Sequence, residues 1–135
     1  IAVDGSASND SGHILGELRQ ALYLARADCG AEAMSAMDAL ELGTWRSAEL
    51  IGRDDIGRIA AGFCGDCALF PVHDLYYNGC ENAGDARLIC HPRQVSELII
   101  GGNIRINNGF LSSIDLDELM NSHRDRAEQI QKNLH

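Results

Sequence analysis

The sequence is poor in aromatic and in basic side chains, and both deficits restrict the partners it can have. Phe, Trp and Tyr make up 5% of the 135 residues, and 11 Lys and Arg stand against 20 Asp and Glu, which gives a formal net charge of −9. A nucleic-acid partner needs clustered cations for its phosphates, and single strands also need aromatic faces for stacking. We therefore expect no nucleic-acid partner.

The sequence also lacks long apolar runs. None approaches the roughly 20 consecutive residues of a membrane-spanning helix, which predicts no membrane association. A secretory signal pattern is absent as well, and the cysteines number five, so one is left over after any complete set of pairs. These features favour reduced thiols in a cytoplasmic protein.

A CxxC pattern joins Cys64 and Cys67, a spacing found in redox pairs and in zinc sites. No second CxxC and no neighbouring pair of histidines completes four ligands, and Cys67 falls in an alternating run typical of a strand. The sequence therefore favours buried structural thiols, with no metal and no obligatory disulfide. Cys29, Cys80 and Cys90 have no partner spacing and receive the same interpretation.

The first ten residues combine an apolar segment with a polar turn. Ile1–Val3 is typical of the end of a buried strand, and Asp4 follows it directly, before small polar residues and a helical pattern. A carboxylate at the carboxyl end of a strand lies where α/β enzymes place their catalytic groups. Asp is also common in turns, so Asp4 can equally serve only to turn the chain or to cap the helix.

Apolar spacing predicts helices in the first part of the chain and at its end. The spacing is helical over residues 13–27, ending at Cys29, and we expect residues 28–51 to be helical too. The candidate caps are Asn9, Asp10 or Ser11 for the first helix, Ser35 for the second and Ser113 for a final helix.

The apolar period changes from helical to two after the turn-rich segment 52–57. Gly101-Gly102 is a two-residue hairpin signal between two of the resulting segments. The expected strands are Asp66–Val72, Arg87–Cys90, Val95–Gly101 and Asn103–Asn107.

Three segments, in order along the chain, resemble the metal-dependent amidohydrolases. Val3–Asp10 is similar to the segment that follows the last strand of their barrel, and is closest to the branch that holds 8-oxoguanine deaminase, guanine deaminase and the hydroxyatrazine ethylaminohydrolases. Leu50–Ile59, continuing into Gly62–Phe70, resembles the family's Gly-Arg-x-Asp-Ile-Gly turn and the strand after it. Val95–Arg105 resembles a hairpin near the family's C-terminus.

The resemblance implies an α/β fold, namely the C-terminal part of a (β/α)8 TIM-barrel amidohydrolase. The implied divisions are residues 1–52 for the last barrel strand and its helices, 53–110 for part of a small β-sandwich, and 111–135 for a C-terminal helix. The chain starts inside the expected strand and without Met, so we expect the rest of such an enzyme to precede it.

The resemblance also implies a role for Asp4. In the family, the Asp at this position binds the catalytic divalent metal, zinc or alternatively iron, and shuttles the proton of the attacking water. Ser6, Ser8 and Asn9 are weaker candidates for substrate binding, which either orient Asp4 and border the pocket or only form the turn.

The family takes its other metal ligands from a His-x-His pair and from further histidines, and this chain has no such pair. We therefore expect the segment to be inactive alone. Its histidines are His13, His73, His91, His123 and His135.

The resemblance implies an aminohydrolase that deaminates a purine-like or triazine-like ring. The implied partners are a small heterocyclic substrate, the preceding part of the same protein, and further copies in a homo-oligomer. Two alternatives stay open: another amidohydrolase specificity, such as a chlorohydrolase, and a non-catalytic binding module made by a truncated gene.

Overall fold

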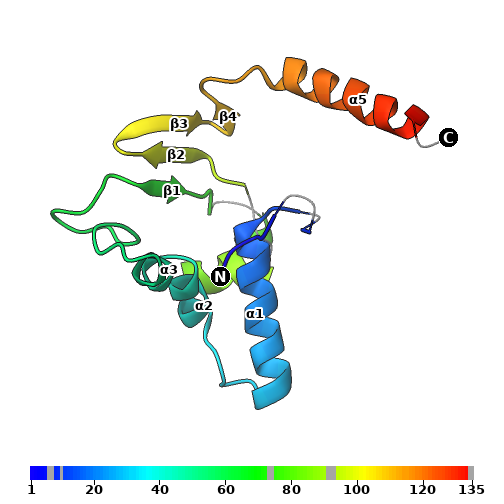
Figure 1. Ribbon diagram of the computed structural model, residues 1–135. Helices are drawn as coiled ribbons and strands as arrows, with labels where there is room; N and C mark the ends of the chain where they lie inside the picture. The colour runs from blue at the N-terminus through cyan, green and yellow to red at the C-terminus, as the bar shows by residue number, and fades with distance from the viewer. Residues whose placement is uncertain (6–7, 10, 73–74, 91–93, 134–135) are drawn as a thin grey trace.

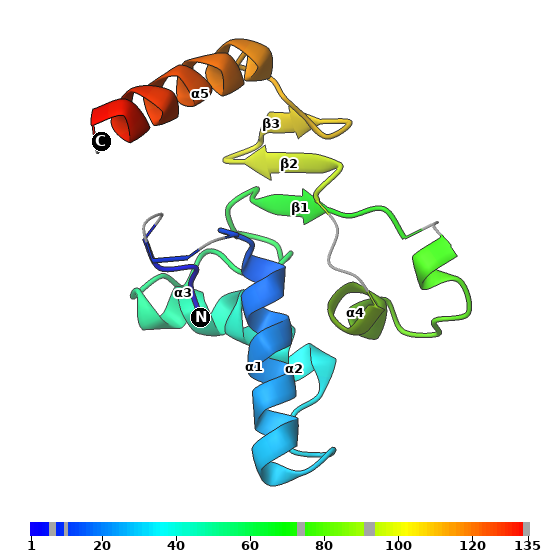
Figure 2. The same cartoon turned by 90° about the vertical axis from the view of Figure 1, so that its right-hand side faces the viewer.

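A computed structural model describes residues 1–135 except 6–7, 10, 73–74, 91–93 and 134–135. The chain has a mixed α/β architecture in three parts. A helical group contains α1 (Ile14–Cys29), α2 (Ala36–Leu42) and α3 (Trp45–Leu50), and an antiparallel sheet follows it in the sequence. Figures 1 and 2 both show the sheet between this group and α5 (Leu116–Asn133).

The core lies in the helical group because apolar side chains recur there at helical spacing. Leu15, Leu18 and Leu22 on α1 are buried and pack with residues of α2 and with Leu88. The predicted helix over 13–27 is confirmed, and it ends where expected, with Gly30 as its C-cap at φ 97°. Its N-cap differs from the expectation, because the Nδ1 atom of His13 accepts the hydrogen bond from the Gly16 amide at 3.3 Å.

The expectation of helix throughout residues 28–51 is wrong in part. Ser35 caps α2 as predicted, in a capping box in which Ser35 and Asp38 each accept from the other's backbone amide. The pKa of the Asp38 carboxyl is lowered because its Oδ2 atom accepts from the Ser35 hydroxyl at 2.7 Å and from the Ser35 amide at 2.8 Å. The helix then stops at Leu42, and α3 begins only at Trp45. A Cβ atom at Gly43 would lie 2.5 Å from Cδ1 of Leu18, so the break lies where α2 approaches α1 closely.

The sheet contains β1 (Cys67–Leu69), β2 (Glu97–Ile100), β3 (Asn103–Asn107) and β4 (Phe110–Leu111), paired antiparallel in that order. Ile99 lies opposite Cys67 on one side and Ile104 on the other. Gly101 and Gly102 have φ values of 56° and 75°, which the two-residue hairpin turn requires, so the predicted hairpin is confirmed.

Two segments expected as strands are not strands. Residues 87–90 belong to a π-helical turn, Ala86–Cys90, which follows two other short helices, the 3₁₀ turn Leu75–Tyr77 and α4 (Ala83–Asp85). Leu88 is fully buried in the helical core, so tertiary packing overrides the local preference. Within residues 1–5 the described backbone forms no strand either, since a barrel strand needs neighbouring strands to pair with.

The last helix, α5, begins at Leu116 and is capped by Asp115 rather than by the expected Ser113. The Oδ1 atom of Asp115 accepts hydrogen bonds from the amides of Asp117 and Glu118 at 3.0 and 3.1 Å, which caps the helix. No described residue of α5 is buried. In the described part of the chain, no helix combines the length and the apolar character that crossing a membrane demands.

Candidate functional site

Asp4 occupies an exposed position in a left-handed backbone conformation, with φ at 62°. Among non-glycine residues, Asp and Asn tolerate this conformation because their short polar side chains bond to the local backbone. Here the Oδ1 atom of Asp4 accepts a hydrogen bond from the Gly5 amide at 2.8 Å. Asn108, in the turn after β3, shares this left-handed conformation at φ 50°.

The turn after Asp4 is closed by Ser8 and Asn9. The carbonyl oxygen of Gly5 accepts from the amides of Ser8 and Asn9 at 2.9 and 3.1 Å, and from the Ser8 hydroxyl at 3.1 Å. Ser8 therefore stabilises the turn that carries Asp4. Ser6, the other serine predicted here, lies outside the described residues.

Asn9 links this turn to helix α1. Its Oδ1 atom accepts from the amides of Ser11 and Gly12 at 2.9 and 2.8 Å, and its Nδ2 atom donates to Oε1 of Glu17 at 2.8 Å in a partly buried contact. Glu17 is not among the residues predicted for the site, although it is the acidic residue in the first turn of α1. A hydrogen-bonded path thus runs from α1 through Asn9 and Gly5 to Asp4.

The residues that the structure describes do not assemble a metal site by themselves. Among the described residues, no three His, Cys, Asp or Glu side chains come together in a group that could hold a metal ion. His13 caps α1 and His123 is exposed on α5. The other three histidines, His73, His91 and His135, lie outside the described residues.

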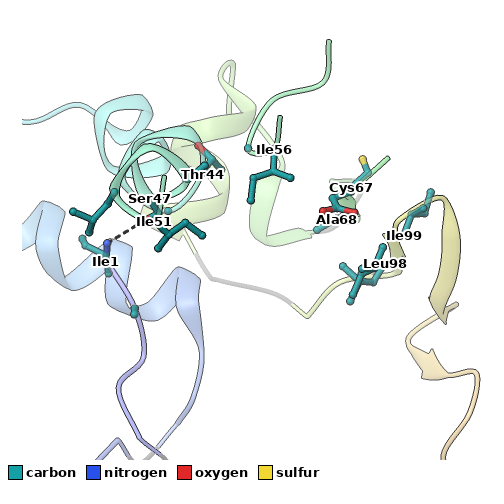
Figure 3. A pocket seen from close by; sticks show the side chains of 16 residues that line it. Ile1, Thr44, Ser47, Ile51, Ile56, Cys67, Ala68, Leu98 and Ile99 are labelled. Atoms are coloured by element: carbon teal, nitrogen blue, oxygen red, sulfur yellow. Dashed lines mark hydrogen bonds between the residues drawn. The ribbon is translucent and has the colours of Figure 1, made fainter. Parts of the chain in front are cut away.

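A cavity of about 760 Å³ lies between the start of the chain, α3 and the β1–β2 pair (Figure 3). The dashed line in Figure 3 joins the amino group of Ile1 to Oγ of Ser47, 3.3 Å away, so the first residue lies against α3. Asp4 does not line this cavity. Its lining is mainly apolar and includes Ile1, Ala48, Ile51, Ile56, Ala68, Leu98 and Ile99.

The thiols are more exposed than predicted. Cys67 is half-buried, and Cys29, Cys64, Cys80 and Cys90 are exposed, so the expectation of buried structural thiols is wrong. The four exposed thiols lie outside the strands, at helix ends or in loops, where no second layer covers them. The expectation of no partner spacing is also wrong for two of them, because the Sγ atoms of Cys80 and Cys90 lie 3.3 Å apart.

Cys64 is bound to an ion pair instead of to Cys67. Arg53 and Asp55 form a bidentate contact, Nε to Oδ1 at 2.5 Å and Nη2 to Oδ2 at 2.8 Å, and Cys64 Sγ donates to Oδ2 of Asp55 at 3.2 Å. The hydrogen bond to Asp55 raises the pKa of the Cys64 thiol, and Arg53 holds the pKa of the Asp55 carboxyl well below its usual range. This arrangement fixes the 53–64 loop.

Replacing Asp55 is expected to make Cys64 more reactive. The raised pKa keeps Cys64 protonated, and only the thiolate is alkylated, so Asp55→Asn should increase the rate of iodoacetamide alkylation about threefold to tenfold at about pH 8. Peptide mass spectrometry over a time course measures this rate. Asp54→Asn, at the adjacent exposed carboxylate, is the matched control and should leave the rate unchanged. An unchanged or lower rate in Asp55→Asn would contradict the assigned cause.

One family model matches most of the chain. The model of the amidohydrolase family matches residues 1–105. The chain belongs to the amidohydrolase family. The resemblance drawn from Val3–Asp10, Leu50–Phe70 and Val95–Arg105 is therefore confirmed.

Individual relatives of this amidohydrolase chain include deaminases and an atrazine chlorohydrolase. It is 39% identical to 8-oxoguanine deaminase of Pseudomonas aeruginosa over 130 residues, which cover 96% of this chain and 29% of that protein. The structure resembles zinc-bound atrazine chlorohydrolase from Arthrobacter aurescens (TM-score 0.81, 28% identity, 87% of this chain and 27% of that one). It also resembles a zinc-bound adenosine deaminase from Xanthomonas campestris (TM-score 0.88, 26% identity, 95% of this chain and 30% of that one).

The amidohydrolase chain therefore spans less than a third of the length of each of these relatives.

Proposed function

We propose that this chain is the C-terminal part of a metal-dependent aminohydrolase in which Asp4 is a metal ligand and the acid–base group. The observation that carries the proposal is the left-handed, hydrogen-bonded conformation of Asp4 at the motif that resembles the family's catalytic segment. An exposed carboxylate is a suitable ligand for zinc or iron, and both zinc-bound structural relatives favour zinc.

The chemistry proposed for Asp4 is proton transfer. A bound divalent metal would lower the pKa of the attacking water. The Asp4 carboxylate takes the proton of that water and passes it to the leaving amine, which general acid–base catalysis requires of a group within hydrogen-bond reach of both. Ser8 and Asn9 hold the turn, so Asp4 keeps one orientation during this transfer.

The remaining ligands would come from the part of the enzyme that this chain does not contain. We propose that residues 1–52 complete a TIM barrel, that 53–110 contribute to a β-sandwich, and that 111–135 form a helix docked on the rest of the protein. The exposure of large apolar side chains supports such a covering part, since Leu50, Ile51 and Ile59 are 84%, 69% and 89% exposed. The chain alone would then be inactive.

The proposed substrate is a purine-like ring, such as 8-oxoguanine or guanine. The 39% identity to an 8-oxoguanine deaminase favours this class. A triazine ring is the second candidate, and with it loss of chloride in place of an amine, because of the structural similarity to atrazine chlorohydrolase. We also propose a cytoplasmic homo-oligomer, for which the exposed apolar residues of α5, among them Leu119, Met120 and Ile130, offer a contact surface.

Metal removal and reloading of the complete protein test this proposal. We expect zinc-loaded protein to release ammonia from 8-oxoguanine or guanine, to lose this activity with a chelator, and to regain it with zinc or iron. Chloride release from a chlorotriazine is measured in parallel to separate the two substrate classes. Residues 1–135 expressed alone are the matched control and should show no turnover. Turnover by residues 1–135, or turnover that survives complete metal removal, would contradict the proposal.

A further inference from the structure

Cys80 and Cys90 form a close pair of exposed thiols. Their Sγ atoms lie 3.3 Å apart, and both side chains are accessible to solvent. Cys80 follows the 3₁₀ turn Leu75–Tyr77, and its amide donates to the Tyr77 carbonyl at 3.1 Å. Cys90 is the last residue of the turn Ala86–Cys90, so the chain between the two thiols folds back on itself.

Packing onto the helical core holds the two thiols together. Leu88 is fully buried between α1 and α2, and the carbonyl oxygen of Ile89 accepts from Nη2 of Arg19 at 3.1 Å and from the Tyr23 hydroxyl at 3.4 Å. Within the turn, the amide of Ala86 donates to the Asn82 carbonyl at 3.0 Å. The position of Cys90 is thus fixed to α1, and the separation of the sulfurs follows from the fold of the segment.

We propose that Cys80 and Cys90 form a reversible dithiol–disulfide site that exchanges with low-molecular-weight disulfides of the glutathione class. The two sulfurs need to approach by only about 1 Å to reach bonding distance, which small side-chain rotations allow. Neither residue belongs to the site around Asp4, so this property is independent of the proposed catalysis.

The exchange takes place in two thiol–disulfide displacements. The thiolate of Cys90 attacks one sulfur of oxidised glutathione, forms a mixed disulfide and releases one glutathione thiolate, which takes up the proton that Cys90 lost. The thiolate of Cys80 then attacks the Cys90 sulfur and displaces the second glutathione, which takes up the proton of Cys80. Two protein thiols are oxidised, and one disulfide is reduced to two thiols.

Cys90 is assigned the first attack because of the environment of Cys80. The pKa of the Cys80 thiol is raised, chiefly by its hydrogen bond with Cys90 and further by burial and by the nearby Asp85 carboxylate. A thiol with a raised pKa supplies less thiolate for the initial attack. Cys29 serves as the comparison, since its thiol is exposed and donates to a carboxylate oxygen, Oδ2 of Asp28, at 3.4 Å.

The test equilibrates the reduced complete protein, without oxygen, against mixtures of oxidised and reduced glutathione. Acid quenching, alkylation of free thiols and peptide mass spectrometry then identify each cysteine's state. We expect a Cys80–Cys90 cross-link that has lost two hydrogens. At one fixed concentration of reduced glutathione, it should be half-formed at a concentration of oxidised glutathione at least about tenfold lower than the one that half-modifies Cys29, because the second thiol is already in place.

Variants separate the two steps. Cys80→Ser should leave a stable glutathione adduct on Cys90, since no resolving thiol remains, whereas Cys29→Ser should not change the cross-link. In denaturing urea the preference over Cys29 should fall, because the fold no longer holds the pair together. The proposal is wrong if Cys80 and Cys90 stay reduced or take up separate glutathiones where Cys29 is modified. It is equally wrong if the preference is the same in urea.

Discussion

Asp4→Asn in the complete protein is expected to lower kcat/KM for the purine substrate by about 10²–10⁴-fold. Asn keeps the shape of Asp and an oxygen that can accept from the Gly5 amide, so the turn should persist. It cannot take up a proton from water, and it is a poorer metal ligand than a carboxylate. Steady-state kinetics and the zinc content of the purified protein measure the two losses separately.

A matched control variant shows whether the expected losses are specific to Asp4. Asp54→Asn changes another exposed carboxylate of the chain by the same chemistry and should leave kcat/KM and zinc content near wild type. Thermal unfolding of both variants, compared with wild type after metal removal, should be unchanged. If Asp4→Asn deaminates its substrate at close to the wild-type rate, the roles proposed for Asp4 are excluded.

A helix whose apolar side chains form the core could be predicted from the sequence. The structure of short apolar segments could not, because it depends on tertiary packing. Leu15, Leu18 and Leu22 recur at helical spacing, and they form the buried face of α1. Residues 87–90 are similarly apolar, and their pattern predicts a strand. Instead, Leu88 packs in the helical core and the segment forms a π-helical turn. Its short length gives periodicity little power to separate the two states.

The site could be predicted only where local chemistry determines it. Asp4 stands in a recognisable motif, and its left-handed conformation agrees with an unusual role. The contacts between Asn9 and Glu17 and between Cys80 and Cys90 join residues eight and ten positions apart through irregular chain. No periodic pattern specifies such contacts, because they depend on the path of the loop.

The hydrogen bond between Asn9 and Glu17 is expected to set the position of Asp4, and reversing its polarity tests this. Asn9→Asp should lower kcat/KM about 10- to 100-fold, since it places two carboxylates at a contact of 2.8 Å and displaces the turn. Glu17→Gln should stay close to wild type, because the new amide oxygen can still accept from Nδ2 of Asn9.

Combining Asn9→Asp with Glu17→Gln should restore most of the activity. The carboxylate at position 9 still accepts from the Ser11 and Gly12 amides, and the amide at position 17 can now donate to it. The bond between positions 9 and 17 is thus remade with its polarity reversed, and the other two bonds are kept. We expect a coupling free energy of about 1–2 kcal/mol in the double-mutant cycle on kcat/KM. Zinc content and urea unfolding, measured on all four proteins, separate a shift of Asp4 from a loss of fold. A double variant as impaired as Asn9→Asp alone would show that the path from α1 to Asp4 does not control catalysis.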